Sequence, residues 1–167
     1  MLILGIDPGS RHTGYGLVDS QGEKLEALAY GRISCPPDLA VPQRLAYLAC
    51  EVESIVDNWQ PQAAVLETPF HGLNSRSLVV LAEARGALLA VLAARGLEIR
   101  EYTPAEVKSA VTGNGRADKG QVARMVQIIL SMVGKKTSTD ATDALAVAIC
   151  FAHRRRQDDL VGKNTAS

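Results

Sequence analysis

Four carboxylates in this chain combine residue types and spacing that can do chemistry together. Asp7 ends the first apolar run, LILGI, and Glu67 ends a second one, AAVL. Asp140 and Asp143 are three residues apart in DATDALAVAI, whose helical periodicity places them on one face. Because clustered carboxylates repel one another unless a cation lies between them, such a set indicates a bound divalent metal.

The chemistry that this set can support is phosphodiester hydrolysis. Two metal ions held about 4 Å apart by carboxylates activate a water molecule and stabilise the leaving oxygen. Oxygen-only ligands favour Mg²⁺ or Mn²⁺ over zinc, and the three histidines are isolated in sequence. Two Mg²⁺ ions would add about +4 to the charge of the site, which favours a nucleic-acid partner.

Each acid also has a plainer explanation. Asp7 is placed to cap the turn that follows it, and Glu67 to be a solvent-facing strand end. Asp140 fits a capping box with Thr137 in a first helical turn, where acids are favoured anyway. These alternatives remain open for each residue alone, whereas the coincidence of all four favours a site.

The elements that must position these acids follow from the apolar periodicity and the breakers. Strands are predicted at LILGID, TGYGLVDS, KLEALAYGRI, AAVLE and LEIREY. Helices are predicted at about 42–59, 75–95, 104–113, 119–133 and 140–154, the fourth opened by a capping box of Asp118 and Gln121. Three strands followed by alternating helices and strands predict a mixed α/β sheet with helices on both faces. If the strands that carry Asp7 and Glu67 are neighbours, both acids point into one crevice beyond the strand ends.

Length and composition predict one domain over residues 1–156 and a flexible tail at 157–167. No apolar run approaches the ~20 residues that cross a bilayer, and the N-terminus has no basic signal-peptide region. We therefore expect a cytoplasmic protein with no membrane partner. The helix at 75–95 carries more apolar surface than one contact face needs, which favours either packing against a second copy or burial within the monomer.

The net charge is zero, with 18 basic and 18 acidic residues, but many of the basic residues are clustered in two regions of the sequence. Residues 106–136 carry a local excess of positive charge, and Arg154–Arg156 form a second cluster without an assigned role. A neutral protein still binds nucleic acid when its positive charge faces one way. Solvated helix faces explain either cluster equally well when it is taken alone.

The motifs together resemble the RuvC family of Holliday junction resolvases. The resemblance is carried by GIDPGSRHTGYG, LETPF, EARG, VKSAVTGNGRADKGQV and DATDALAVAI, in matching order from about residue 2 to 154. The gaps of 60, 73 and 3 residues between the acids differ from those of ribonuclease H and the retroviral-type integrases. The resemblance implies a ribonuclease H-like fold of five mixed strands, a homodimer, and paired Mg²⁺-dependent nicks in opposed strands of a four-way DNA junction. It also implies two Mg²⁺ ions per active site, replaceable by Mn²⁺, and a branch-migration helicase complex as partner in recombination and repair.

Matched by motif, Asp7, Glu67, Asp140 and Asp143 take the family's catalytic, metal-binding positions. Lys108 and Lys119 match its lysines, which are expected to contact junction phosphates or support cleavage, although a lysine at a solvated helix start is the plainer explanation of Lys119. Phe70 is expected to stack on a base near the crossover, unless it folds back on the core. Arg76 is a DNA-binding candidate by location only.

Three other functions are compatible with parts of the sequence. The glycine turn after Asp7 also resembles the phosphate loop of the actin-like ATPases, but 167 residues cannot supply the two domains that these proteins need. A non-catalytic branched-DNA-binding module on the same fold would be expected to have lost an acid, and none is missing. A related nuclease acting on RNA or on other branched DNA remains an alternative.

Overall fold

Five strands form one mixed sheet in the computed structural model, which describes residues 1–68 and 75–164. The strands are β1 (Leu2–Asp7), β2 (His12–Gln21), β3 (Lys24–Ser34), β4 (Ala63–Glu67) and β5 (Glu98–Tyr102). Their order across the sheet is β3-β2-β1-β4-β5. The first three strands pair antiparallel, and β4 pairs parallel with both β1 and β5. This confirms the predicted mixed five-stranded sheet and makes the two acid-bearing strands neighbours.

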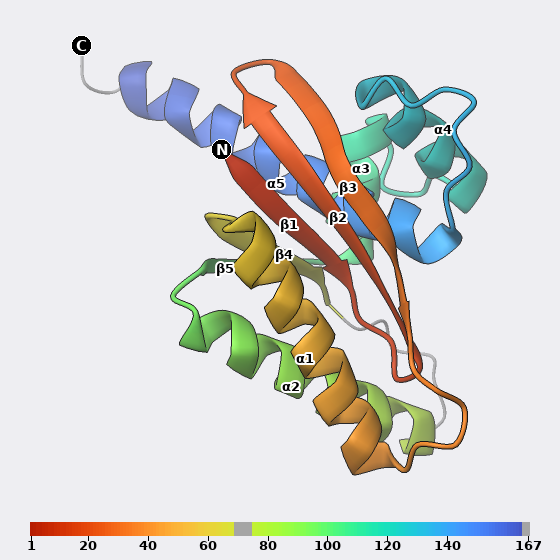
Figure 1. Ribbon diagram of the computed structural model, residues 1–167. Helices are drawn as coiled ribbons and strands as arrows, with labels where there is room; N and C mark the ends of the chain where they lie inside the picture. Colours follow the sequence, from red (N-terminus) through yellow and green to blue (C-terminus); the bar gives the residue numbers. More distant parts are fainter. Residues whose placement is uncertain (69–74, 165–167) are drawn as a thin grey trace.

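Helices cover both faces of the sheet (Figure 1), which is also as predicted. They are α1 (Val41–Trp59), α2 (Ser75–Ala94), α3 (Pro104–Thr112), α4 (Lys119–Ile129) and α5 (Thr139–Asn164). One apolar layer joins the sheet to α1 and α2, and a second joins it to α3, α4 and α5. Because side chains alternate along a strand, Leu4 and Ile6 of β1 enter the first layer while Ile3 enters the second.

The ends of α4 and α5 can be compared with the capping residues predicted from the sequence. The predicted capping box of Asp118 and Gln121 is confirmed at the start of α4. This helix ends four residues earlier than the predicted Val133, because Ser131 adopts a left-handed backbone with φ of 53° and cannot continue it. At the start of α5, the Ser138 hydroxyl accepts from the amide of Ala141 at 3.2 Å, so the capping hydroxyl is one residue later than predicted.

Helix α5 is longer than predicted. The predicted end near Arg154 is wrong, and the helix continues to Asn164, across residues 157–164 of the segment predicted to be a flexible tail. Each arginine of the second basic cluster pairs with an acid that is remote in sequence, so the helix is held at the point where it was predicted to end. The pairs are Arg154 with Glu106 at 3.3 Å, Arg155 with Glu98 at 2.7 Å, and Arg156 with Glu23. The cluster is thus largely neutralised within the monomer.

Helix α2 is apolar on most of its circumference. Ala84, Leu88 and Leu92 are buried beneath it, whereas Val79 is 56% exposed. By length and composition alone residues 76–94 are apolar enough to cross a membrane, so the expectation that no segment approaches this length is wrong for α2. The same segment carries Glu83 and Arg85, and it packs against α1 and β5. We therefore interpret it as a helix of the folded domain that is buried on one side and exposed on the other.

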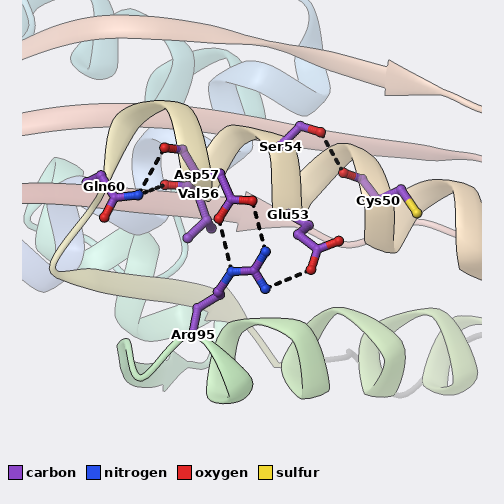
Figure 2. Close-up of polar contacts among 7 residues, drawn as sticks. All are labelled: Cys50, Glu53, Ser54, Val56, Asp57, Gln60 and Arg95. Atoms are coloured by element: carbon purple, nitrogen blue, oxygen red, sulfur yellow. Dashed lines mark hydrogen bonds and ion pairs between the residues drawn. The ribbon is translucent and has the colours of Figure 1, made fainter.

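An arginine clamp joins α1 to the end of α2. Arg95 lies directly after α2 and extends between Glu53 and Asp57 of α1 (Figure 2). Its guanidinium lies 2.7 Å from the Glu53 carboxylate and 2.8 Å from that of Asp57. This clamp fixes the relative position of the two helices on the face of the sheet opposite α5.

Candidate active site

The strands deliver Asp7 and Glu67 to the same face of the sheet. In β1, Ile3 and Asp7 share one parity, and in β4 so do Val65 and Glu67. Ile3 and Val65 pack in the layer beneath α5, so the acids at the strand ends face α5 as well. The last paired residues of the two strands are Ile6 and Leu66, which places the two acids next to each other beyond this pair.

Glycines bring the helix that carries the other two acids onto the strands. A Cβ atom at Gly14, which pairs with Asp7 in the sheet, would lie 2.0 Å from the backbone oxygen of Asp140. A Cβ atom at Gly5 would lie 2.0 Å from the backbone oxygen of Ala144, one turn further along α5. Only glycine permits such an approach. At both glycines the main chain of a strand therefore lies directly against the main chain of α5.

The four acids interact strongly. Burial, and then the charges of Asp143, Glu67 and Asp140, raise the pKa of Asp7 to about 7. Burial and the charge of Asp143 also raise the pKa of Glu67. The structure thus brings all four predicted acids together, with Asp7 at the centre of the set.

Two lysines border the acid cluster, as their sequence positions suggested. Lys119, the first residue of α4, lies 3.2 Å from the Asp143 carboxylate, and this carboxylate raises the pKa of Lys119. Lys108 of α3 is near enough to offset part of the rise in the pKa of Glu67. A pocket of about 390 Å³ lies between these groups, with Glu67, Asp143 and both lysines as its polar lining. Its apolar lining is Pro104, Val107, Val122 and Ala146.

Sequence reasoning missed a third cation at the cluster. Arg32 of β3 lies 3.6 Å from the Asp140 carboxylate. It is opposite Gly14 in the β2–β3 pairing, and that register is the only signal that would have located it. Two of the four acids are therefore paired with cations, Asp140 with Arg32 and Asp143 with Lys119.

The donor set at the cluster fits a hard divalent cation by its chemistry. The acids supply only oxygen ligands, and their mutual repulsion helps to raise the pKa of Asp7 to about 7. Within residues 1–68 and 75–164, no group of three His, Cys, Asp or Glu side chains lies close enough together, as the side chains stand, to hold a metal ion. A divalent ion would relieve the repulsion, draw the carboxylates toward itself and compete with Lys119 and Arg32 for them.

The two remaining predicted residues are not placed at the cluster. Phe70 lies outside the described residues. Arg76 is exposed in the first turn of α2 and does not line the pocket beside the acids. The DNA contacts of both residues stay predictions.

Four buried polar side chains were not singled out from the sequence. They are the buried polar or charged residues of the described chain, namely Thr13, Arg44, Arg85 and Thr142. Each one bonds to backbone close to an acid. Their bonds are Thr13 with Gly9, Arg44 with Ser10, Arg85 with Glu67 and Thr142 with Ser138.

Comparison with known proteins gives a consistent result. The family model described as crossover junction endodeoxyribonuclease RuvC matches residues 3–151. The RuvC of Syntrophomonas wolfei is 43% identical over 156 residues, which are 93% of this chain and 91% of that protein. The structure is similar to Thermus thermophilus RuvC, with a TM-score of 0.87, 29% identity, and coverage of 95% of this chain and 97% of that one. For T. thermophilus RuvC in complex with a Holliday junction substrate, the TM-score is 0.85 at 27% identity, with 94% and 96% of the chains covered. On its fold, its acid cluster and these relatives, the chain belongs to the RuvC family of crossover junction endodeoxyribonucleases.

Proposed function

We propose that this protein resolves Holliday junctions with two Mg²⁺ ions held by Asp7, Glu67, Asp140 and Asp143. Family membership makes it a crossover junction endodeoxyribonuclease, an enzyme of recombination and repair that depends on a metal. The identity of the ion, the number of ions and their ligands are the proposal. It rests above all on the convergence of the four acids where β1 and β4 end beside α5, and the raised pKa of Asp7 supports it.

The chain's own residues have separate tasks in this proposal. The bound ions supply an activated water and stabilise the charge on the leaving oxygen. Asp7 and Glu67 from the strands, with Asp140 and Asp143 from α5, would hold the ions. Lys108 and Lys119 border the adjacent pocket and are free to bind phosphate once the carboxylates are neutralised by metal. The start of α4 adds backbone N–H groups beside Lys119, which suits the same phosphate.

Paired nicks require two active sites, and α2 offers the surface on which two copies can meet. It exposes Val79 on a helix that is apolar on most of its circumference. A two-fold dimer built on this surface would place two identical sites on opposed strands of a junction. We include in the proposal a stacking role for Phe70, a DNA contact for Arg76, cooperation with a branch-migration helicase complex, and a cytoplasmic location.

A cleavage assay tests this function directly. The purified protein should nick a synthetic four-way junction symmetrically with Mg²⁺, or with Mn²⁺ in its place, and leave linear duplex of the same sequence nearly uncut. Asp7→Asn should still bind the junction and not cut it. Equal cutting of junction and linear duplex would contradict the junction-selective function and favour a related nuclease. Near-normal cleavage by Asp7→Asn would refute the assignment of the acids.

A further inference from the structure

We infer that Arg85 is a positioning residue for the acid cluster, one that fixes the backbone of Glu67 and so holds its carboxylate beside Asp7 and Asp143. The inference rests on the proposed metal-binding role of the four acids and adds a residue that does not itself touch the ions. Arg85 lies in α2, on the side of the sheet opposite α5, and is only 8% exposed.

The contacts of Arg85 converge on the end of β4. Its Nη1 donates to the backbone oxygen of Glu67 at 2.6 Å. Its Nη2 donates to the carboxylate of Glu101 on β5, which also supplies the countercharge. A buried guanidinium is unfavourable unless it is paired in this way, so the protein retains it for the bonds that it makes.

Glu67 lies at the end of β4, where the strand is hydrogen-bonded to β5 on one side and is no longer paired with β1 on the other. The pairing of β1 with β4 ends at Ile6 and Leu66, one residue before Glu67. On the β5 side, the amide of Thr68 donates to the oxygen of Tyr102 at 2.8 Å. The bond from Arg85 holds the Glu67 carbonyl, so the peptide bond between Glu67 and Thr68 is fixed at both its oxygen and its nitrogen.

The guanidinium is suited to this task in a way that an ammonium is not. A planar fork donates to the Glu67 carbonyl and to the Glu101 carboxylate at once and in fixed directions. Lysine keeps the charge opposite Glu101 but offers a single flexible nitrogen. We therefore expect Arg85→Lys to retain part of the effect and Arg85→Met to lose it.

The other buried polar residues support a role in the site rather than in the fold at large. Thr13 and Arg44 bond to the turn that follows Asp7, at Gly9 and Ser10. The Thr142 hydroxyl donates to the oxygen of Ser138, at the start of the helix that carries Asp140. Within the described chain, buried polar groups are thus used next to each of the segments that carry the acids.

Metal binding without DNA tests the inference. Mn²⁺ affinity is measured by calorimetry for the wild type, Arg85→Lys and Arg85→Met, together with junction affinity in metal-free buffer and thermal unfolding. We expect Arg85→Met to weaken Mn²⁺ binding about 10-fold or more. Arg85→Lys should fall between this variant and the wild type, and junction affinity should change less than about 2-fold for both. The Mg²⁺ concentration for half-maximal cleavage should rise in the same order.

Arg95→Met is the matched control, because it removes a second guanidinium clamp at the end of the same helix, away from the acids (Figure 2). It should lower the unfolding temperature and leave Mn²⁺ affinity unchanged. Wild-type Mn²⁺ affinity in both Arg85 variants, or an equal loss in Arg95→Met, would overturn the inference. If Arg85→Met does not fold, the Mn²⁺ affinity of Arg85→Lys, compared with the wild type and Arg95→Met, tests the inference alone. A wild-type protein that binds Mn²⁺ but does not cut junctions would refute the proposed function and leave this comparison intact.

Discussion

Lys119 and Asp143 form an ion pair of 3.2 Å at the edge of the acid cluster, between the first residue of α4 and the first turns of α5. The lysine side chain is 77% exposed, so the pair itself contributes little to stability. Its importance is electrostatic. The pKa values of Asp7 and Glu67 are both raised, and the charge of Lys119 offsets part of this rise and of the repulsion among the acids. In the absence of metal, the positive charge of Lys119 partly neutralises the acids, as a divalent ion would.

Replacing this lysine should therefore separate metal binding from cleavage. Lys119→Gln removes a cation that competes for Asp143, so Mn²⁺ should bind at least as tightly as to the wild type at pH 8. Cleavage at saturating Mg²⁺ should still fall, by about 10-fold or more, because the phosphate contact is lost. Calorimetry and single-turnover cleavage measure the two effects. Weaker metal binding in this variant would show that Lys119 supports the ions instead of competing with them.

The pKa of Asp7 predicts how stability depends on pH. The pKa is about 7 in the folded protein and 3.8 as the ordinary value, so the folded state holds this proton more tightly than the unfolded chain. Stability from this group is complete below pH ~4, falls as the pH rises toward about 7, and stays low above it. The loss at pH 8 is at most on the order of 4 kcal/mol. Asp7→Asn removes the titration, so without metal it should be more stable than the wild type at pH 8 and similar near pH 4.

Urea unfolding in a metal chelator at both pH values checks this prediction. Saturating Mg²⁺ should reverse the order at pH 8, because the ion binds only the folded wild-type cluster. Parallel pH profiles for the two proteins would mean that Asp7 titrates normally and is not surrounded by the other acids.

The glycine contacts between β2 and α5 make a prediction about geometry. Gly14→Ala introduces a methyl group 2.0 Å from the Asp140 backbone oxygen, which must move α5 away from Asp7. We expect a loss of about 1–3 kcal/mol in the free energy of unfolding and weaker Mn²⁺ binding. Gly22→Ala is the control for general glycine effects, since nothing lies within 4 Å of its added Cβ, although its φ of 63° carries some strain. Unchanged Mn²⁺ affinity in a destabilised Gly14→Ala would show that the ions tolerate a displaced helix.

The exposed side of α2 predicts the dimer interface. Val79→Glu places a charge on the apolar surface proposed for the second copy and should raise the dimer dissociation constant at least 10-fold. Val133, which is 74% exposed in the segment between α4 and α5, provides the matched control as Val133→Glu. Sedimentation velocity over a range of concentrations distinguishes the two variants. Equal dimerisation of the wild type and Val79→Glu would exclude this surface.

The parts of the site that could be predicted from the sequence are those that depend on local periodicity. The apolar runs that end at Asp7 and Glu67 predict an acid at the end of each strand, and a spacing of three places Asp140 and Asp143 together on α5. The capping box at Asp118 likewise depends only on residues close in the chain. Each of these patterns lies within a few residues, along the sequence, of the feature that it predicts.

The parts that could not be predicted depend on pairing between distant segments. Arg32 reaches Asp140 only because β3 lies where it does, and Arg85 reaches Glu67 across eighteen residues of chain. The length of α5 exceeds its prediction for the same reason, since Glu106, Glu98 and Glu23 are remote in sequence from the arginines that they hold. A basic cluster that looks available for DNA in the sequence is neutralised by these pairs.

The direct backbone contact of α5 with β1 and β2 has a consequence for ion choice. No side chain lies between the main chains at Gly5 and Gly14, so the distance between the backbone of the strands and that of α5 is set by direct contact. Because this backbone separation is set by main-chain contact, it cannot increase to suit a larger ion unless the helix moves away from the sheet. We therefore expect Ca²⁺, which prefers longer metal–oxygen distances and more ligands than Mg²⁺, to be a poorer substitute for Mg²⁺ in cleavage than Mn²⁺.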